Sequence, residues 1–451
     1  MKFRNVGELT TAWKLVLSNA YWGCAMKDLA LDRRSIPKPE RVRTTARRSV
    51  AGFTVTAVLL LVAAASGLGG EVYGTFTAVG EMNDARSYHT ATLLPNGKVL
   101  IAGGRRTYRE ELDSAELYDP ALHKFIPTGK MHWARAGHTA TLLPDGRVLI
   151  AGGFQPGDAL ASAELYDPAS GSFRPTGRMT VARQWHSATL LPDGKVLIAG
   201  GASNQTGITP TAELYDPATG KFVATGSLTV ARMLHYAVAL DKGAVLIIGG
   251  VRGGGPNFLF SGHNFLASAE LFDPRLGRFT EVPGTGFGRS TGSNGSAVLL
   301  ASGKVLIAGG IDGEVIVSSA RLYDPATGQF VDARSMGSER FWHEATLLGD
   351  GCVLVTGGMK TNQWPGPVVV ATAELYDPQR GAFLRLPDMT TPRAAHTATL
   401  LPDGQVLIAG GVRGSFIAVS SAELFRPAPA ISAHRAGAKN SSGRGRGAIR
   451  G

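Results

Sequence analysis

The stretch ARAGHTATLLPDGRVLIAGG, residues 134–153, is followed after eight residues by SAELYDPASGSFRPTGRM, residues 162–179. Close copies of both parts recur along the 451-residue chain at a spacing of roughly 50 residues, which indicates a repeat architecture. The Gly-Gly pair begins at Gly103, Gly152, Gly200, Gly249, Gly309, Gly357 and Gly410. The Glu-Leu-Tyr-Asp-Pro element begins at Glu116, Glu164, Glu213, Glu270, Arg321, Glu374 and Glu423. Seven copies of each predict seven structural units.

Each unit divides into four short strands. The segment HTATLL alternates and ends at Pro-Asp-Gly, a tight-turn sequence, whereas KVLIAGG is a continuous apolar run, as a strand buried on both faces requires. AELYDP alternates again and ends at a second turn, Asp-Pro-x-x-Gly, where proline fixes φ and glycine takes the left-handed conformation. The last strand carries a phenylalanine. Four antiparallel strands every 40–50 residues or so are typical of a propeller blade, so we expect an all-β, seven-bladed β-propeller.

The phase of the repeats predicts how the ring closes. The phenylalanine of the last strand recurs at Phe76, Phe125, Phe173, Phe222, Phe279, Phe330 and Phe383. The first copy, in residues 73–82, precedes any complete unit, and the seventh ELFRP, residues 423–427, is followed by no such strand. We therefore expect residues 73–82 to supply the outer strand of the seventh blade, which removes the free sheet edges.

The Gly-Gly strand, the Ala-Arg-x-x-His opening and the ELYDP strand resemble kelch repeats, especially the bacterial group related to the central propeller of galactose oxidase. The resemblance covers residues 73–427. It departs from the usual kelch repeat in the last strand, where phenylalanine replaces tryptophan and keeps an aromatic packing role. The organisation expected from the sequence is a basic extension over 1–48, an export segment over 49–70, a kelch propeller over 73–427 and a disordered basic tail over 428–451.

The export segment has the order of a secretory signal. Four arginines precede the apolar run Ser49–Leu68, and Ala63-Ala64-Ala65 offers a small-residue cleavage site. The alternative is an uncleaved membrane anchor, because 20 apolar residues can span a bilayer. Positive charge before the run keeps the N-terminus inside in both cases, so we expect an extracytoplasmic propeller, secreted or periplasmic.

The net charge of +11 is not carried by the repeats. Residues 1–65 hold 11 basic and 4 acidic residues, and residues 428–451 hold 5 basic and no acidic ones. The middle, 66–427, keeps 30 basic and 31 acidic residues. A nearly neutral body argues against a nucleic-acid partner. The two cysteines, Cys24 and Cys352, predict no disulfide framework.

The two ends of the blades differ in their loops. The Pro-Asp-Gly and Asp-Pro-x-x-Gly turns lie at one end, which we call the turn face, and they are nearly identical in every unit. The loops after Gly-Gly and the loops at Ala-Arg-x-x-His lie at the other end, which we call the Gly-Gly face, and they vary. Variable loops on a rigid scaffold commonly carry binding sites, so we expect a protein or glycan ligand on the Gly-Gly face.

The binding candidates on this face are aromatic and cationic residues of the variable loops, and for each a structural role is the alternative. Trp185 and Trp342 either contact ligand or pack between blades, and the arginines either bind ligand or lie in solvated loops. The candidates are Tyr88, Arg105, Arg106, Tyr108, Arg109, Trp185, His263, Trp342, Lys360 and Trp364.

An Arg-x-x-His pair opens six units and is absent from the fifth, which has Gly292 and Gly295 instead. A residue pair repeated around a ring is more simply architecture, such as blade-to-blade hydrogen bonds, than a metal site. The fifth unit also has a glycine-rich start, beside the long loop of the fourth, so blades four to six form an irregular sector.

We expect a non-catalytic binding module without metal or other cofactor. The alternatives are a carbohydrate-active propeller similar to sugar epimerases and a copper oxidase similar to galactose oxidase. The copper ligands of that family cannot be carried over, because Cys352 is expected on the turn face and we expect no further domain after residue 430. No residues of the epimerases can be placed on this sequence either. We expect a monomer that contacts a membrane only through residues 49–68.

Overall fold

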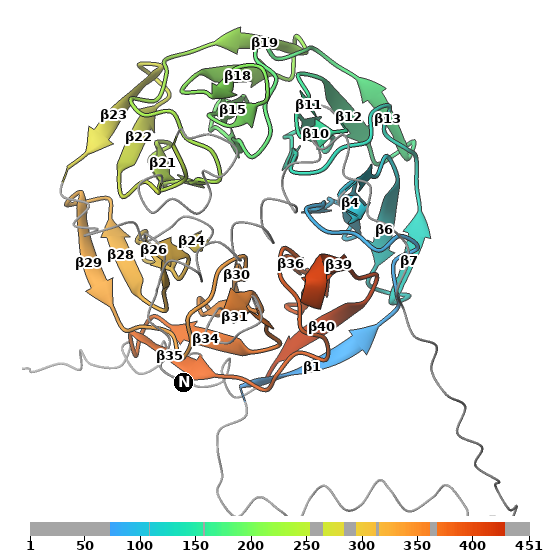
Figure 1. Cartoon of the computed structure of the whole chain (residues 1–451), viewed down its shortest axis with the longest axis vertical. Coiled ribbons are helices and arrows are strands. Elements are labelled where there is room, and N and C mark those ends of the chain that lie inside the picture. The colour runs from blue at the N-terminus through green and yellow to red at the C-terminus, as the bar shows by residue number, and fades with distance from the viewer. Residues whose placement is uncertain are drawn as a thin grey trace, which may run out of the picture. The chain divides into compact units, whose positions relative to one another are not determined.

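The computed structural model describes residues 73–107, 109–156, 158–252, 265–283, 295–312, 315–360 and 368–428. The basic extension, the export segment and, apart from Ala428, the tail lie outside the described residues. Within the described part, seven four-stranded antiparallel sheets surround a central axis as the blades of a propeller (Figure 1). The all-β, seven-bladed expectation is confirmed. Among these residues we find no helix with the length and apolarity to cross a bilayer.

Blades 1 to 4 each follow the chain order from the axis outwards. Blade 1 consists of β2 (Thr90–Leu93), β3 (Val99–Ala102), β6 (Ala115–Asp119) and β7 (Lys124–Pro127). Blade 2 consists of β8 (Thr139–Leu142), β9 (Val148–Ala151), β12 (Ala163–Asp167) and β13 (Ser172–Pro175). Blade 3 consists of β14 (Ser187–Leu190), β15 (Val196–Ala199), β18 (Ala212–Asp216) and β19 (Lys221–Ala224). Blade 4 consists of β20 (Tyr236–Ala239), β21 (Val245–Ile248), β22 (Ala269–Asp273) and β23 (Arg278–Val282).

Blades 5 and 6 keep this order, and blade 7 takes its outer strand from the start of the propeller. Blade 5 consists of β24 (Ser296–Leu299), β25 (Val305–Ala308), β28 (Ala320–Asp324) and β29 (Gln329–Ala333). Blade 6 consists of β30 (Glu344–Leu347), β31 (Val353–Thr356), β34 (Ala373–Asp377) and β35 (Ala382–Arg385). Blade 7 consists of β36 (Thr397–Leu400), β37 (Val406–Ala409), β40 (Ala422–Pro427) and β1 (Gly74–Val79).

The closing strand is placed as the sequence predicts. β1 pairs antiparallel with β40 in a register that sets Gly74 opposite Pro427 and Val79 opposite Ala422. The rings of Phe76 and Phe425 lie 5.0 Å apart, as do those of the corresponding pair Tyr118 and Phe125 in blade 1. In Figure 1 the blue β1 arrow lies against the red β40. The two ends of the propeller are thus joined within one sheet.

Burial explains the unbroken apolar sequence of the second strands. Every residue of β3 is buried, and its side chains alternate between the two neighbouring blades. Val99 and Ile101 pack with residues of blade 7, whereas Leu100 and Ala102 pack with residues of blade 2. Because both faces of each blade are covered by another blade, this strand has no polar face to expose.

Short hairpins occupy the loops after Gly-Gly, which the sequence analysis treated as irregular. The described residues contain six of them: β4 (Arg105–Thr107) with β5 (Glu110–Glu111), β10 (Phe154–Gln155) with β11 (Asp158–Ala159), β16 (Ala202–Ser203) with β17 (Gly207–Ile208), β26 (Ile311–Asp312) with β27 (Val315–Ile316), β32 (Met359–Lys360) with β33 (Val368–Val369), and β38 (Val412–Arg413) with β39 (Ile417–Ala418). A 3-10 turn, η2 (Gly414–Phe416), links the last two strands. Each hairpin therefore projects from the Gly-Gly face.

The Gly-Gly pair lies where adjacent blades come closest. In blade 2 both residues have positive φ, 61° at Gly152 and 91° at Gly153. A Cβ atom on Gly152 would lie 2.5 Å from the carbonyl oxygen of Arg183 in blade 3, and one on Gly153 would lie 2.8 Å from that of Ala136. Both the conformation and the contact exclude a side chain. The backbones of adjacent blades therefore approach closely at this pair.

Candidate functional site

A buried arginine links three segments of its blade just below the Gly-Gly face. In blade 2, Nη1 of Arg135 donates to the carbonyl oxygen of Gly152 at 2.6 Å, and Nη2 donates to Oε1 of Glu164 at 3.0 Å. The other carboxylate oxygen of Glu164 accepts the backbone N–H of His132 at 2.8 Å. The arginine thus connects the loop before the first strand, the Gly-Gly turn and the third strand.

The same network recurs in six blades of the described chain. Its arginines are fully buried, and each pairs with the glutamate that opens the third strand of its own blade. The pairs are Arg86–Glu116, Arg135–Glu164, Arg183–Glu213, Arg232–Glu270, Arg340–Glu374 and Arg393–Glu423. Burial lowers the pKa of each arginine, and the charge of the paired glutamate opposes that shift.

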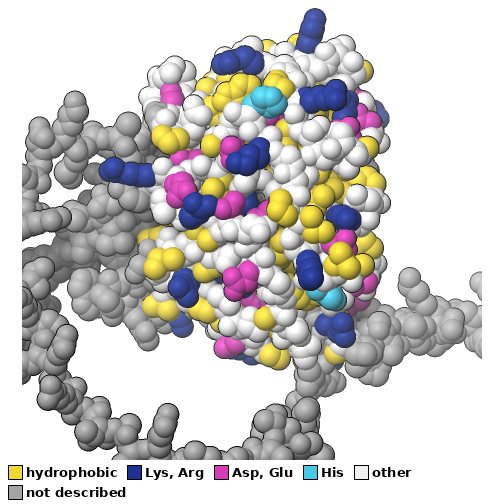
Figure 2. Space-filling view, turned by 90° about the vertical axis from the view of Figure 1, so that its right-hand side faces the viewer, with side chains coloured by type: hydrophobic (Ala, Val, Ile, Leu, Met, Phe, Trp, Pro, Cys, Tyr) yellow, Lys and Arg dark blue, Asp and Glu magenta, His cyan; other side chains and the backbone are white. Residues whose placement is uncertain are grey.

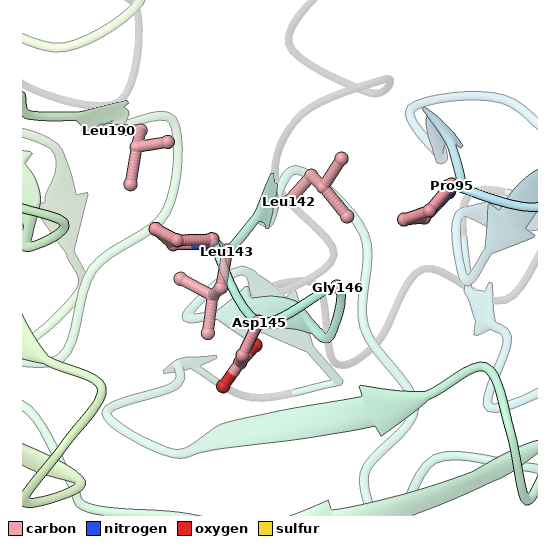
Figure 3. A pocket seen from close by; sticks show the side chains of 7 residues that line it. Pro95, Leu142, Leu143, Asp145, Gly146 and Leu190 are labelled. Atoms are coloured by element: carbon pink, nitrogen blue, oxygen red, sulfur yellow. The ribbon is translucent and has the colours of Figure 1, made fainter.

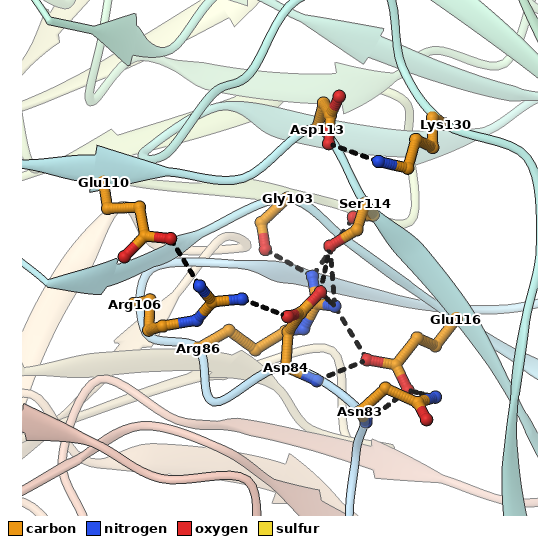
Figure 4. A network of polar contacts seen from close by, with 10 residues as sticks. All are labelled: Asn83, Asp84, Arg86, Gly103, Arg106, Glu110, Asp113, Ser114, Glu116 and Lys130. Atoms are coloured by element: carbon orange, nitrogen blue, oxygen red, sulfur yellow. Dashed lines mark hydrogen bonds and ion pairs between the residues drawn. The ribbon is translucent and has the colours of Figure 1, made fainter.

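Blade 1 extends its network to the surface (Figure 4). Arg106 on β4 forms ion pairs with Asp84 and with Glu110. Burial by itself would raise the pKa of Asp84, but hydrogen bonds from Ser114 and Arg106, together with the charges of Arg86 and Arg106, lower it. Arg106, predicted as a binding residue, is therefore held by two carboxylates.

Six histidines link neighbouring blades. Nε2 of His138 lies 3.0 Å from Oγ1 of Thr90, the first residue of the innermost strand in the preceding blade. His89, His186, His235 and His343 repeat this contact with Thr397, Thr139, Ser187 and Ser296. His396 reaches Thr356 instead. The architectural interpretation of the Arg-x-x-His pair is therefore confirmed, with arginine acting within a blade and histidine between blades.

Burial keeps these imidazoles neutral. It lowers the pKa of His89, His235 and His343 to about 3, with nearby arginine charge as the second cause, and it lowers the pKa of His138, His186 and His396 well below the usual value. A neutral ring with its proton on Nε2 donates to the hydroxyl that it contacts. Nε2 of each ring is thus used in the scaffold.

A chain of backbone hydrogen bonds runs around the axis just above the histidines. The residue before each histidine has a left-handed conformation, at Tyr88, Gly137, Trp185, Leu234, Trp342 and Ala395. In five of them the N–H donates to the carbonyl of the counterpart in the preceding blade. These bonds run from Ala395 to Trp342, Tyr88 to Ala395, Gly137 to Tyr88, Trp185 to Gly137 and Leu234 to Trp185. Residues other than glycine rarely adopt this backbone conformation, so the hydrogen bonds between blades hold them in it.

Three predicted aromatic residues meet at this level although they come from blades 1, 3 and 6. The Tyr88 ring lies 5.2 Å from that of Trp185 and 5.9 Å from that of Trp342, edge to face in both cases. Arg105 is buried, and its guanidinium lies 4.7 Å from the centre of the Tyr88 ring. We call these four residues the axial aromatic cluster. It brings four of the predicted residues together on the Gly-Gly face.

The remaining candidates do not join this cluster. Arg109 lies exposed at the tip of the β4–β5 hairpin, and Lys360 is half-buried on β32. Tyr108, His263 and Trp364 lie outside the described residues. Phe154 and Phe416, which were not predicted, pack against Trp185 and Trp342 from two hairpins. No local pattern marks these two residues, because their contacts depend on how the hairpins fold over the axis.

A pocket of about 530 Å³ lies on the turn face (Figure 3). It is lined by Pro95, Leu142, Leu143, Pro144, Asp145, Gly146 and Leu190. The only charged group among them, Asp145, is paired with Arg147. Ligand sites combine apolar walls with a few converging polar groups, so this pocket lacks the features of a specific site.

The charges of the propeller are mixed. Figure 2 shows basic and acidic side chains interspersed over one side of the ring. In the part of the chain that the structure describes, no three His, Cys, Asp or Glu side chains converge as a metal site requires.

Comparison with known proteins supports the fold and the repeat. The family model described as the kelch motif matches residues 294–337, which contain blade 5. A solved structure described as a "novel fungal alcohol oxidase with catalytic diversity among the AA5 family, in complex with copper" has a TM-score of 0.60 and 19% identity, and covers 79% of this chain and 76% of that chain. At that identity the likeness shows the fold alone. A search of curated proteins finds no match.

One blade thus matches the kelch motif, and the described residues form a seven-bladed β-propeller whose blades repeat the same sequence elements. Kelch propellers in general mediate protein interactions, so the fold is consistent with a binding module. A fold shared by many activities does not by itself name a ligand.

The sequence analysis missed the Arg–Glu pairs, although one signal was present. Blade 5, which lacks the arginine and the histidine, is also the blade in which Arg321 replaces the glutamate. Nε of Arg321 forms an ion pair at 2.6 Å with Oδ1 of Asp332 on the outer strand of the same blade. A buried carboxylate without its arginine would be costly, so both partners are replaced together. Internal comparison of the seven copies could have revealed the pairing.

The glutamate of the buried pair is expected to be far more important for stability than its surface counterpart. Glu164→Ala leaves the guanidinium of Arg135 buried without its carboxylate and should lower the free energy of unfolding by about 3–5 kcal/mol. Arg321→Ala, at the equivalent position of blade 5, breaks an ion pair with the exposed Asp332 and should cost less than about 1 kcal/mol. Chemical denaturation of both variants measures the difference, and equal losses would contradict the role of the pair.

The buried histidines should make the protein sensitive to acid. Because the folded pKa of His235 is about 3 and the unfolded value is about 6.5, its contribution is fully present above pH 6.5 and is lost as the pH falls toward 3. The melting temperature of the wild type should therefore fall steadily over that range. His235→Asn should flatten this dependence, whereas His123→Asn, in an exposed turn, should leave it unchanged. A wild-type melting temperature independent of pH between 6.5 and 4 would refute the prediction.

Proposed function

We propose that the protein is an exported binding module that holds a protein or carbohydrate ligand on its Gly-Gly face. The observation that carries this proposal is the axial aromatic cluster, which gathers Tyr88, Trp185 and Trp342 from three blades on the face with variable hairpins. Aromatic side chains with apolar faces and polar edges are well suited to contact both sugars and protein surfaces.

The contrast between scaffold and hairpins supports the choice of face. The buried Arg–Glu pairs and histidine contacts are nearly the same in six blades, whereas the hairpins carry different residues in each. They present Arg109 on β4–β5 and Lys360 on β32–β33 around the axis. Rigid repeats that carry variable loops are a common design of binding proteins.

The residues of the axial aromatic cluster also pack against one another. In our proposal Trp185 and Trp342 therefore both pack between blades and contact the ligand. A Cβ atom on Gly137 would lie 3.2 Å from the Trp185 ring, so this ring covers the backbone of blade 2. Trp185 and Trp342 are nevertheless only half-buried. In our proposal their accessible edges form the floor of the site, and the hairpins form its rim.

Ligand binding should depend on the Gly-Gly face and not on the turn face. We expect Arg109→Ala and Lys360→Ala together to weaken binding at least tenfold, because charged rim residues steer and orient ligands. The matched control, Lys242→Ala, changes an exposed lysine of a turn on the opposite face and should have no effect. Binding is found with a glycan array and by pull-down with extracytoplasmic extracts, and is then measured by titration.

The enzyme alternatives are tested on the same preparations. Copper at one atom per chain, together with oxidation of an alcohol, would replace our proposal with the oxidase. Conversion of a bound sugar would favour the carbohydrate-active alternative. Binding that is lost equally in the Lys242→Ala control would place the ligand elsewhere.

Export is a separate part of the proposal and rests on the sequence of residues 41–68. A fusion of residues 1–72 to a reporter that is active only outside the cytoplasm should be active, because the basic residues precede an apolar run. Replacing Leu59, Leu60 and Leu61 with arginines should abolish this activity. An inactive fusion of the unchanged segment would contradict export. The size of the reporter protein distinguishes cleavage from an uncleaved anchor.

A further inference from the structure

The first residue of the innermost strand is serine or threonine in five of the seven blades. These residues are Thr90, Thr139, Ser187, Ser296 and Thr397, and each contacts the histidine of the following blade. The two departures are Tyr236 in blade 4 and Glu344 in blade 6. They lie on either side of blade 5, in the irregular sector.

Tyr236 has a structural explanation. The following blade has Gly295 where the others have histidine, so the usual partner is missing. The longer phenol of Tyr236 spans the gap, and its hydroxyl donates to the carbonyl oxygen of Gly295 at 2.6 Å. The two changes thus compensate each other and keep blades 4 and 5 linked.

Glu344 has no such explanation. Nε2 of His396 in blade 7 lies 3.0 Å from Oγ1 of Thr356, which supplies the hydroxyl partner that the other histidines have. Thr356 is directly opposite Glu344 in the β30–β31 register, where other blades have alanine or isoleucine. The hydroxyl has therefore moved to the neighbouring strand, which leaves position 344 without a role in the ring.

The carboxyl group of Glu344 has no hydrogen-bond or ion-pair partner among the described residues. The strands packed against β30 are β24, β31 and β36, and none of their residues is titratable. The titratable groups nearby are the neutral His343 and His396, and Tyr236, whose pKa rises mainly through burial and partly through Glu344. Glu344 is half-buried. Because β30 is the innermost strand of blade 6, Glu344 lies beside the ring axis.

This environment makes Glu344 costly to the fold. Burial raises its pKa to about 8, so the side chain is mostly protonated at neutral pH. The unfolded chain ionises near pH 4.5, so this residue lowers stability increasingly as the pH rises from 4.5 to 8. A residue that costs stability and has no structural partner is commonly retained for function.

We infer that Glu344 is a ligand-binding residue at the ring axis and that it takes a protonated amino group of the ligand on the Gly-Gly face. The inference rests on the proposed function and specifies its ligand chemistry. An unpartnered carboxyl in a desolvated place is best complemented by a cation. A metal ion would need several protein ligands, and no such group exists in the described chain.

The axial aromatic cluster is close enough to serve the same ligand. Trp342 precedes Glu344 by two residues, so their Cα atoms are at most about 7.6 Å apart. The faces of tryptophan and tyrosine attract organic cations, and Tyr88 already has the guanidinium of Arg105 over its ring. Ligand binding would leave the amine protonated and ionise Glu344, whose proton passes to the solvent.

The first test needs no ligand. Glu344→Gln should raise the melting temperature at pH 8 to 9, and the difference should disappear below pH 4.5. The control Glu281→Gln, with the same change on exposed β23, should show no such pattern. A Glu344→Gln protein that is less stable than the wild type at pH 8 would show a structural role for the carboxyl and would overturn the inference.

The second test uses paired probes that differ only in the amine. A glucosamine oligosaccharide is compared with its N-acetylated form, and a lysine-containing peptide with its acetyl-lysine form, so the arms separate a sugar from a peptide source. We expect the amine form of one pair to bind at least tenfold more tightly. Titration in two buffers at pH 7 should show proton release, and Glu344→Gln should remove both effects.

The outcomes distinguish this inference from the proposed function. If acetylated or neutral ligands bind equally well, and binding depends on Arg109 and Lys360 but not on Glu344, the binding module stands and the amine inference is wrong. If no ligand of any kind binds to the Gly-Gly face, both are wrong.

Discussion

The structure depends on a buried ion pair that is repeated from blade to blade. A buried arginine needs its charge balanced and its donors satisfied. At Arg86 the carboxylate of Glu116 balances the charge, and this carboxylate and two backbone carbonyls accept hydrogen bonds from the two Nη groups. The contact with the first glycine carbonyl fixes the direction in which the chain leaves the second strand. The hairpins and the left-handed residues that hold the axial aromatic cluster follow directly from that turn. The contact between the buried arginine and the glycine carbonyl thus determines where the axial aromatic cluster lies.

Blade 5 shows that this ion pair is an addition to the kelch fold and not a requirement of it. The kelch family model matches this blade, although it has neither the arginine nor the glutamate. Its glycines, its apolar second strand and its Tyr323–Phe330 contact are sufficient to form the sheet. The other six blades add a network that stiffens the Gly-Gly face, so the sector around blade 5 is where the ring has most freedom to differ.

The sequence predicted most of the fold because its signals are local. Alternation, the Pro-Asp-Gly turns and the unmatched strand at 73–82 each act within one unit or between its two ends. The pairing of Arg135 with Glu164 is not visible in this way, because 29 residues separate them and a charged residue usually indicates an exposed position. The meeting of Tyr88, Trp185 and Trp342 was likewise beyond pattern analysis, since it depends on how seven blades close around one axis. Tyr108, His263 and Trp364 stay predictions, because they lie outside the described residues.

The closing strand also determines the direction in which the propeller is presented. Gly74 is opposite Pro427 in the seventh blade, and both residues are at the end of their strands that lies on the turn face. The chain therefore begins and finishes the ring at one corner, on the side away from the hairpins. Any attachment through either end, whether to a membrane, a polymer or a neighbouring domain, would therefore be made from the turn face. It would leave the Gly-Gly face open toward the surroundings, where a soluble ligand or another cell would be met first.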